Sequence, residues 1–358
     1  MIPSFMLLGL LINESGCFEM VVGNISTANV TVNVLCNVKP GSLTANDFSQ
    51  VIGLLMGTTV LTVAVIGNGL VCYIVIFSYQ MRSLINLLIV NIAVSDLFLS
   101  LLYVPFLLYV LFLNHWPFGN RLCYMFCYSI AVAVQVSSYT MVAISVNRYI
   151  AVVWPLRTRA SRKHTKSIIA VVWVVAAISS LPFLYITSVE QPSIWYQKCE
   201  LYVCFGSRWN ENVPRVYKEL LITMQMLIPG SILLFTYGSI AVALWRRRRK
   251  QRSVTLPKSN IKTIQMMIII VIAFIVSWTP FNIFLTLTNT DPLLSMITRD
   301  EHSHLWFLLY WMGMSHSCYN PIICICMNDQ YQIEFIGLMH RILGCGRFTH
   351  MLRRPITA

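Results

Sequence analysis

Residues 84–111 read LINLLIVNIAVSDLFLSLLYVPFLLYVL, a segment in which Asp96 is the single charged side chain. An α-helix needs roughly 20 mostly apolar residues to cross a bilayer, and this segment exceeds that length. Hydrocarbon offers no water to backbone N–H and C=O groups, so a spanning segment must satisfy them internally. We therefore predict that these residues cross a membrane as an α-helix.

Six further segments have the same apolar character, and polar loops separate them. The predicted spans are residues 51–77, 84–111, 122–153, 167–185, 217–245, 264–287 and 305–327. An odd number of spans puts the two tails on opposite sides of the membrane. Residues 329–343 carry apolar side chains at helical spacing, which predicts a short amphipathic helix on the membrane surface.

These segments predict an all-α membrane protein, a seven-transmembrane helix bundle with a short amphipathic helix after the seventh span. Residues 1–50 form the predicted extracellular glycosylated tail, residues 51–327 the seven-transmembrane domain, and residues 328–358 the cytoplasmic amphipathic helix and tail.

Composition excludes an ordinary soluble domain, and the placement of charge argues against a nucleic-acid partner. The chain has 358 residues, of which 57% are hydrophobic and 11% charged, whereas about 25% of residues in soluble domains are charged. With the N-terminus outside, 19 of the 26 Lys and Arg residues lie on the inner side, as in cytoplasmic loops. We predict a multi-pass plasma-membrane protein with an extracellular N-terminus. The basic run from Arg246 to Lys250 would contact anionic membrane lipids.

Both tails contain predicted modification sites. Asn13, Asn24 and Asn29 each begin an N-glycosylation sequon, which is usable only on the outer side. Cys345 follows the predicted surface helix, where a thiol can be palmitoylated or stay free. Five cysteines fall inside spans and are expected to be small buried apolar residues: Cys72, Cys127, Cys318, Cys324 and Cys326.

Asp96 is a candidate functional residue, because an ionisable group at mid-membrane costs at least about 2.5–3.5 kcal/mol on insertion scales. It could be a purely structural carboxylate. The alternative is a hub for an ion or for hydrogen bonds that joins several helices. The residues at matching heights are Asn68, Ser137, Ser317 and Asn320. A sodium ion near Asp96 is the one cofactor that this hub would suit, and we predict no other.

Two prolines predict helices that can change shape. The sixth predicted span places Phe274, Trp278 and Asn282 on one face, with Pro280 between the last two. The seventh contains Asn320-Pro321. A proline removes an intrahelical hydrogen bond and kinks the helix. Kinks beside polar and aromatic side chains favour conformational change.

These residues, taken in order along the chain, resemble the landmarks of the rhodopsin-like G-protein-coupled receptors. The matching residues are Gly67-Asn68, Asn91-Ile-Ala-Val-Ser-Asp96, Cys123, Asn147-Arg148-Tyr149, Trp173, Pro229, Tyr237, Phe274-x-x-x-Trp278-x-Pro280 and Asn320-Pro321. The resemblance covers nearly all of residues 51–343. It implies that an extracellular ligand controls a heterotrimeric G protein through opening of the sixth helix. The switch residues that it implies are Asn147, Arg148, Tyr149, Tyr237, Phe274, Trp278, Pro280, Asn320, Pro321 and Cys324.

The family resemblance also implies a disulfide between Cys123 and the second outer loop, where Cys199 and Cys204 both stand. The stretch Tyr202-Val-Cys204-Phe resembles the loop of neuropeptide Y receptors, so Cys204 is the expected partner. Cys199 is then spare, either free or paired with Cys17 or Cys36.

Short stretches around Tyr139, Trp154 and His316 resemble the RYamide, luqin and neuropeptide Y receptors, which implies an extracellular peptide ligand. Ile130 stands where amine receptors carry an aspartate, and Met314 where opsins carry a lysine. By family position, the implied ligand-binding residues are Ile130, Gln135, Gln225, Trp278, Phe281, Asn282, Trp306 and Tyr310. Acidic residues of the outer rim, Glu219 and Asp291 among them, would attract a basic, amidated peptide; alternatively they form a plain solvated loop face.

Two departures from the family pattern bear on signalling. Asn147 replaces the usual acid before Arg148, and Cys324 replaces the usual tyrosine after Pro321. A looser inactive state with raised basal activity is expected, unless neighbouring residues compensate. A decoy receptor that binds without signalling is an alternative function. A membrane transporter is a further one, although the sequence shows neither an internal repeat nor several intramembrane charges. We do not expect an enzyme.

Overall fold

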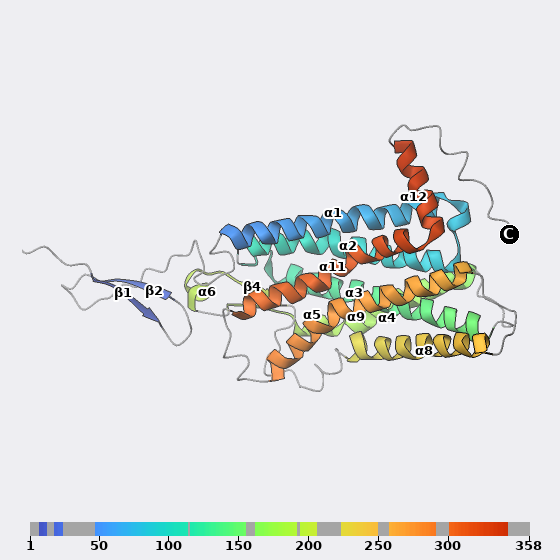
Figure 1. Cartoon of the computed structure of the whole chain (residues 1–358). Coiled ribbons are helices and arrows are strands. Elements are labelled where there is room, and N and C mark those ends of the chain that lie inside the picture. The colour runs from blue at the N-terminus through green and yellow to red at the C-terminus, as the bar shows by residue number, and fades with distance from the viewer. Residues whose placement is uncertain are drawn as a thin grey trace, which may run out of the picture.

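The computed structural model describes residues 7–12, 18–23, 47–113, 115–154, 162–191, 194–205, 223–249, 258–290 and 301–342. Within these residues, long helices run alongside one another and form one bundle (Figure 1). The long helices are α1 (Asp47–Phe77), α2 (Leu84–Leu113), α3 (Gly119–Val153), α4 (Arg162–Ser180), α8 (Ile228–Arg249), α9 (Lys258–Thr290) and α11 (Glu301–Met327). The predicted all-α bundle is therefore confirmed.

Six of the described helices are long and apolar enough to cross a membrane: α1, α2, α3, α4, α8 and α9. The seventh long helix, α11, is not among them, and it carries polar side chains such as His316, Ser317 and Asn320. All three of these residues are buried inside the bundle. The polar side chains lower the hydropathy of α11, and α11 tolerates them because they face other helices rather than lipid.

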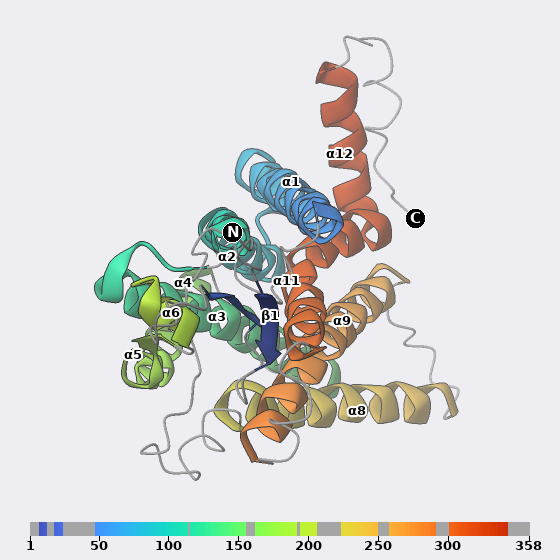
Figure 2. The same ribbon diagram turned by 90° about the vertical axis from the view of Figure 1, so that its left-hand side faces the viewer.

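The central helix of the bundle is α3, as the view along the helix axes shows (Figure 2). In its most apolar window 67% of residues are buried, against 17% in α4. Val171, Val174 and Ile178 of α4 follow helical spacing and are all more than half exposed. Such an apolar stripe suits lipid contact, since lipid tails are as apolar as these side chains.

A polar contact joins α4 to the rest of the bundle. The indole N–H of Trp173 donates to Oδ1 of Asn91, 2.9 Å away, and Nδ2 of Asn91 donates to Oγ1 of Thr140 at 2.8 Å. Trp173, Asn91 and Thr140 belong to α4, α2 and α3 respectively. One asparagine side chain therefore bridges three helices.

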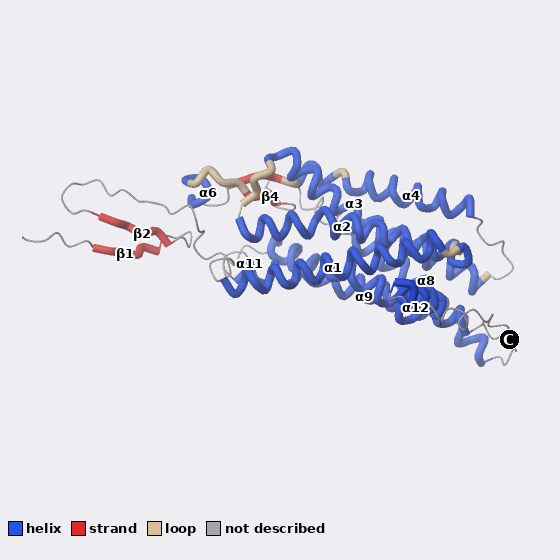
Figure 3. Tube along the Cα trace, turned by 90° about the horizontal axis from the view of Figure 1, so that it is seen from above, coloured by secondary structure: helices blue, strands red, loops and turns tan. Residues whose placement is uncertain are grey.

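Short elements gather at the two ends of the bundle (Figures 1 and 3). At one end lie the hairpin of β1 (Leu7–Ile12) and β2 (Phe18–Gly23), the helices α5 (Pro182–Ile186) and α6 (Ile194–Lys198), and the hairpin of β3 (Ser188–Glu190) and β4 (Val203–Phe205). Both strand pairs are antiparallel, and Val189 stands opposite Cys204. At the other end lie the 3₁₀ turn η2 (Tyr79–Met81) and α12 (Asp329–Ile342).

The helices differ from the predicted spans in three ways. Several begin earlier, as α9 does at Lys258, because a helix continues past the hydrocarbon where its end is polar. The fourth predicted span is interrupted at Leu181, directly before Pro182, and continues as α5. Before Pro229, which lacks a backbone donor, the chain forms a π-helical turn, η3 (Thr223–Leu227). Pro105 lies inside α2 as a third helix-interior proline, besides Pro280 and Pro321.

The N-terminal hairpin of β1 and β2 was not predicted. Each of its strands has six residues, far fewer than a membrane span needs, so the length criterion that revealed the spans did not select them. The surface helix α12 was predicted. It begins with Asp329, whose negative charge suits a helix N-terminus. Its Glu334 accepts a hydrogen bond from Ser78 at 2.8 Å, and its Tyr331 is completely buried.

Candidate functional site

A polar hub lies at the middle of the bundle around Asp96, which is 1% exposed. Nδ2 of Asn320 donates to Oδ2 of Asp96 at 2.6 Å, so this contact joins α11 to α2. The hydroxyl of Ser137, on α3, lies 3.5 Å from Oδ1 of Asp96 and 2.7 Å from the hydroxyl of Ser95. Two of the four residues expected near Asp96 are therefore its hydrogen-bond partners.

Asn68 and Ser317 join the hub without touching the carboxylate. Nδ2 of Asn68 donates to the backbone oxygens of Ser317, at 2.8 Å, and of Ala64, at 2.9 Å. Within the described part of the chain, Oδ1 of Asn68, Oγ of Ser317 and Oδ1 of Asn320 are buried without a hydrogen-bond partner. Oxygen atoms are the ligands that hard cations prefer. The hub residues thus fit a small hard cation.

Helices approach one another closely around this hub. A Cβ placed on Gly67 would lie 2.6 Å from Cγ of Pro321, so a glycine is what lets α1 reach the kinked part of α11. A Cβ on Gly313 would lie 3.2 Å from the ring of Trp278. Phe274 packs edge-on against His316 with ring centroids 5.1 Å apart. Phe274 and Trp278 of α9 therefore pack directly against α11, and Pro321 of α11 packs against α1.

Aromatic side chains form a connected series above Trp278. Ring centroids of Trp278 and Phe281 are 6.5 Å apart, those of Phe281 and Tyr310 5.1 Å, and those of Tyr310 and Tyr103 5.2 Å. Tyr103 stacks on Phe126 at 5.1 Å. The series links α9, α11, α2 and α3. Sequence reasoning missed Tyr103 and Phe126, because aromatic residues in apolar helices are common and their facing is not evident from spacing alone.

Other expected ligand-binding residues are placed differently. Gln135 is buried and accepts a hydrogen bond from Ser179 of α4. Nδ2 of Asn282 donates to the backbone oxygen of Trp278, 2.8 Å away within the same helix. Ile130 is half-buried against the main core. Outside what the structure describes lie the side chains of Gln225 and Trp306 and the whole of Glu219, Asp291, Asn13, Asn24, Asn29 and Cys345.

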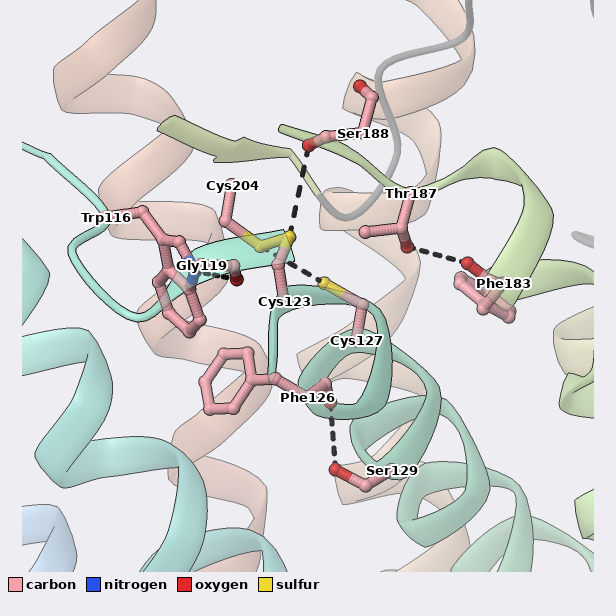
Figure 4. Close-up of a disulfide and its surroundings, with 10 residues drawn as sticks. All are labelled: Trp116, Gly119, Cys123, Phe126, Cys127, Ser129, Phe183, Thr187, Ser188 and Cys204. Atoms are coloured by element: carbon pink, nitrogen blue, oxygen red, sulfur yellow. Dashed lines mark hydrogen bonds between the residues drawn. A yellow bond between two sulfur atoms is a disulfide. The ribbon is translucent and has the colours of Figure 1, made fainter. Parts of the chain in front are cut away.

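A disulfide joins Cys123 of α3 to Cys204 of β4, with their Cα atoms 5.8 Å apart (Figure 4). Beside it, the backbone N–H of Trp116 donates to the backbone oxygen of Tyr202 at 2.7 Å. The indole of Trp116 donates to the backbone oxygen of Gly119 at 2.9 Å. Cys199 is also disulfide-bonded, which excludes the free-thiol alternative, and its partner lies outside the described residues.

At the opposite end of the bundle, a cavity of about 210 Å³ adjoins the C-terminal part of α3. Its lining includes Arg148, Asn86, Lys262, Met327 and Asp329. Nζ of Lys262, on α9, lies 2.8 and 2.9 Å from the two carboxylate oxygens of Asp329, on α12. Both side chains of this ion pair are 53% exposed. The ion pair therefore ties the N-terminal part of α9 to the start of α12.

Cys324 and Tyr331 are buried together near this end. Burial raises the pKa of the Tyr331 phenol well above its usual range, so it stays protonated. Its hydroxyl has no hydrogen-bond partner among the described residues. Tyr149, beside Arg148, packs on Phe235 with ring centroids 6.0 Å apart. At this end of the bundle, Tyr149 of α3 thus borders α8, and Cys324 of α11 borders α12.

Comparison with known proteins agrees with this architecture. Residues 67–323 match the family model described as 7 transmembrane receptor (rhodopsin family). The chain is 37% identical to the RYamide receptor of Drosophila melanogaster, in an alignment that covers 90% of this chain and 71% of that receptor. It is 35% identical to the RYamide receptor of Tribolium castaneum, with 88% of each chain covered. The Tachykinin-like peptides receptor 99D of Drosophila melanogaster is 29% identical over 76% of this chain and 54% of its own length.

Proposed function

The chain belongs to the rhodopsin family of seven-transmembrane receptors, and from that premise we propose that it is a plasma-membrane receptor for an extracellular amidated neuropeptide. The observation that supports the ligand class best is the similarity to two RYamide receptors over 90% and 88% of this chain. Two of the more distant relatives also carry the names of peptide receptors. A ligand ending in Arg-Tyr-amide, as the name RYamide denotes, is the first candidate.

The proposed ligand site lies above Trp278, where the aromatic series runs through Phe281 and Tyr310 to Tyr103 and Phe126. Aromatic rings offer large contact areas and favourable packing for an aromatic peptide terminus. An arginine of the ligand would be drawn by acidic residues of the outer end, of which Glu200 is exposed. Glu219 and Asp291 are proposed members of the same rim, and Ile130, Gln135, Gln225, Asn282 and Trp306 are proposed contacts.

Signal transfer is proposed to run through α9. Movement of the ring of Trp278 would disturb its contact with Gly313, and the Phe274–His316 contact lies one turn further inward. An outward swing of the inner end of α9 would break the ion pair of Lys262 with Asp329 and widen the cavity beside Arg148. The widened cavity would then take a segment of a heterotrimeric G protein.

Raised basal activity belongs to the same proposal. Asn147 is half-buried next to Arg148, and its amide can bond to the guanidinium but cannot neutralise it. Cys324 is buried where the family carries a tyrosine. The Lys262–Asp329 ion pair is half exposed, so it is worth only about 0–1 kcal/mol. The closed state is therefore proposed to be weakly held.

A sodium ion is proposed for the polar hub. Asp96 would supply the negative charge, and the unpartnered oxygens of Asn68, Ser317 and Asn320 would supply neutral ligands. When bound, the ion would neutralise a buried carboxylate and favour the arrangement in which α2 and α11 stay together. Without it, hydrogen bonds from the amide of Asn320 and the hydroxyl of Ser137 offset the charge.

The proposed orientation places the N-terminal tail, residues 1–50, outside with its glycans on Asn13, Asn24 and Asn29. Residues 51–327 form the membrane domain, and residues 328–358 lie in the cytoplasm with α12 at the lipid headgroups. A palmitoyl group on Cys345 would add a second anchor there. Epitope tags on the two tails, detected before and after permeabilising cells, test this orientation: accessibility of both tags on intact cells would refute it.

The decisive experiment measures calcium and cyclic AMP in cells that express the full chain. We expect a saturable response to a peptide ending in Arg-Tyr-amide, and a much weaker one to the same peptide with a free carboxylate. Arg148→Ala should keep peptide binding and lose the response. Binding without any response in the unmodified chain would instead identify a decoy receptor. Absence of binding by amidated peptides would refute the proposed ligand class.

A further inference from the structure

A third sulfur lies against the outer disulfide. Cys127 stands one helical turn after Cys123 on α3, so both side chains leave the same face of the helix. Its Sγ is 3.9 Å from Sγ of Cys204, and the three sulfurs of Cys123, Cys127 and Cys204 lie within 4.8 Å of one another. Figure 4 shows the Cys127 side chain directed at the bridge.

Only one of the two sulfurs in this contact can act as a nucleophile. Cys127 is a free cysteine, whereas both sulfurs of the bridge lack a hydrogen, so only the Cys127 thiol can act as donor or attacking group. From the sequence alone, Cys127 is expected to be a small apolar core residue. A core cysteine of that kind would face other apolar side chains, but this one faces a disulfide sulfur and the loop residue Thr187.

We propose that Cys127 is a disulfide-exchange site, which allows β4 to be bonded to α3 in either of two positions. The Cys127 sulfur loses its proton and attacks Sγ of Cys204. A Cys127–Cys204 bond forms as the Cys123–Cys204 bond breaks, and Cys123 leaves as a thiolate that takes up a proton. One thiol and one disulfide are present before and after, so no oxidant or reductant is required.

The geometry asks for a small movement. A bonded pair of sulfurs is about 2.05 Å apart, so Cys127 and Cys204 must approach by roughly 1.9 Å. The anchor on α3 would shift by four residues, or about 6 Å along the helix axis at 1.5 Å per residue. This shift draws β4 deeper toward the aromatic series that contains Phe126.

Two contacts favour the first position. The backbone N–H of Trp116 holds the backbone oxygen of Tyr202, and β4 pairs with β3 through Val189 opposite Cys204. A deeper anchor strains or breaks the Trp116 contact. The Cys123–Cys204 form should therefore dominate at equilibrium, with the Cys127–Cys204 form as a minor species reached over minutes to hours.

The test maps the sulfur bonds of the full-length receptor. Met125 lies between Cys123 and Cys127, so cyanogen bromide separates the two cysteines, and its acidic conditions prevent exchange during the digest. Receptor from intact cells is denatured in acid with excess N-ethylmaleimide, cleaved and analysed by mass spectrometry. We expect both the Cys123–Cys204 and the Cys127–Cys204 fragments. Cys127→Ala supplies the background level and should retain the first fragment only.

A second variant strengthens the test. In Cys123→Ala, we expect Cys204 to bond to Cys127, so that surface expression exceeds that of the double variant Cys123→Ala/Cys127→Ala. If the unmodified receptor yields no Cys127–Cys204 fragment above the Cys127→Ala background, the proposal is overturned, whether or not Cys123→Ala reaches the cell surface. Peptide response is not part of the readout, so the result is independent of the proposed ligand.

Discussion

Replacing Gly67 by alanine tests the close approach of α1 to the kinked part of α11. A Cβ there would lie 2.6 Å from Cγ and 2.9 Å from Cβ of Pro321, whereas ordinary van der Waals contact begins at 3.4 Å. The helices would have to separate by about 0.8 Å, because a proline ring cannot rotate out of the way. Overpacking of this kind costs about 1–3 kcal/mol. The neighbouring Asn320 donates to Asp96, so the separation would also strain the polar hub.

Gly69→Ala is the matched control, because a Cβ on Gly69 meets nothing within 4 Å. Both variants gain the same helix propensity, about 0.8–1.0 kcal/mol, so the difference between them isolates the clash. The assay heats detergent-solubilised receptor and follows the folded fraction by size-exclusion chromatography with fluorescence detection. At about 2–4 °C per kcal/mol, Gly67→Ala should melt roughly 2–12 °C below Gly69→Ala. Equal melting temperatures, or a higher one for Gly67→Ala, would show that α1 does not need a glycine to approach Pro321.

Three further predictions concern the end of the bundle that holds Arg148 and α12. Removing the ion pair by Lys262→Ala or Asp329→Ala should raise ligand-free G-protein turnover about 1.4- to 5-fold, the equivalent of about 0.2–1 kcal/mol. The charge-swapped double variant Lys262→Asp/Asp329→Lys should return turnover to the native level. If turnover stays raised in the double variant, the two side chains do not act together. Asn147→Asp should lower basal turnover at matched surface expression, because a carboxylate can neutralise the neighbouring arginine; an unchanged basal signal in guanine-nucleotide exchange would count against a weakly held closed state. Tyr331→Ala should destabilise the receptor by about 3–5 kcal/mol, as for other large buried aromatics. Tyr331→Phe should melt at nearly the native temperature, because the hydroxyl that it removes has no partner among the described residues. An equal loss of thermal stability in both variants would mean that the phenol oxygen is hydrogen-bonded.

The spans could be predicted because crossing a bilayer imposes a length and a composition that few other structures need. The packing of side chains within the bundle was harder to predict from the sequence. Asp96 stood out by its charge, and its contact with Asn320 follows from matching heights. The amide of Asn68 instead binds a backbone oxygen of Ser317, and backbone acceptors carry no residue signature. Hydropathy also gave no sign that Gln135 would face α4, because polarity does not reveal on which side of a helix a residue lies.

The ends of the bundle were harder still. The ion pair of Lys262 with Asp329 joins residues 67 positions apart in sequence, and exposed charges of opposite sign are too common for their pairing to be inferred. The direction of Cys127 was missed for a related reason, since a cysteine in an apolar run suggests burial alone. Chain connectivity, rather than local pattern, brings β4 over it.

The contact between Trp173 and Asn91 has a consequence for how the fourth spanning helix finds its place. In water, burial of the apolar face fixes the rotation of an amphipathic helix. In a bilayer, acyl chains are as apolar as leucine side chains, so burial of apolar surface does not favour one rotation over another. For a helix that is mostly surrounded by lipid, the hydrogen bonds of Trp173 with Asn91 and of Ser179 with Gln135 set the rotation about its own axis. Docking of α4 during assembly of this receptor would then depend on hydrogen bonds between helices rather than on the burial of apolar surface.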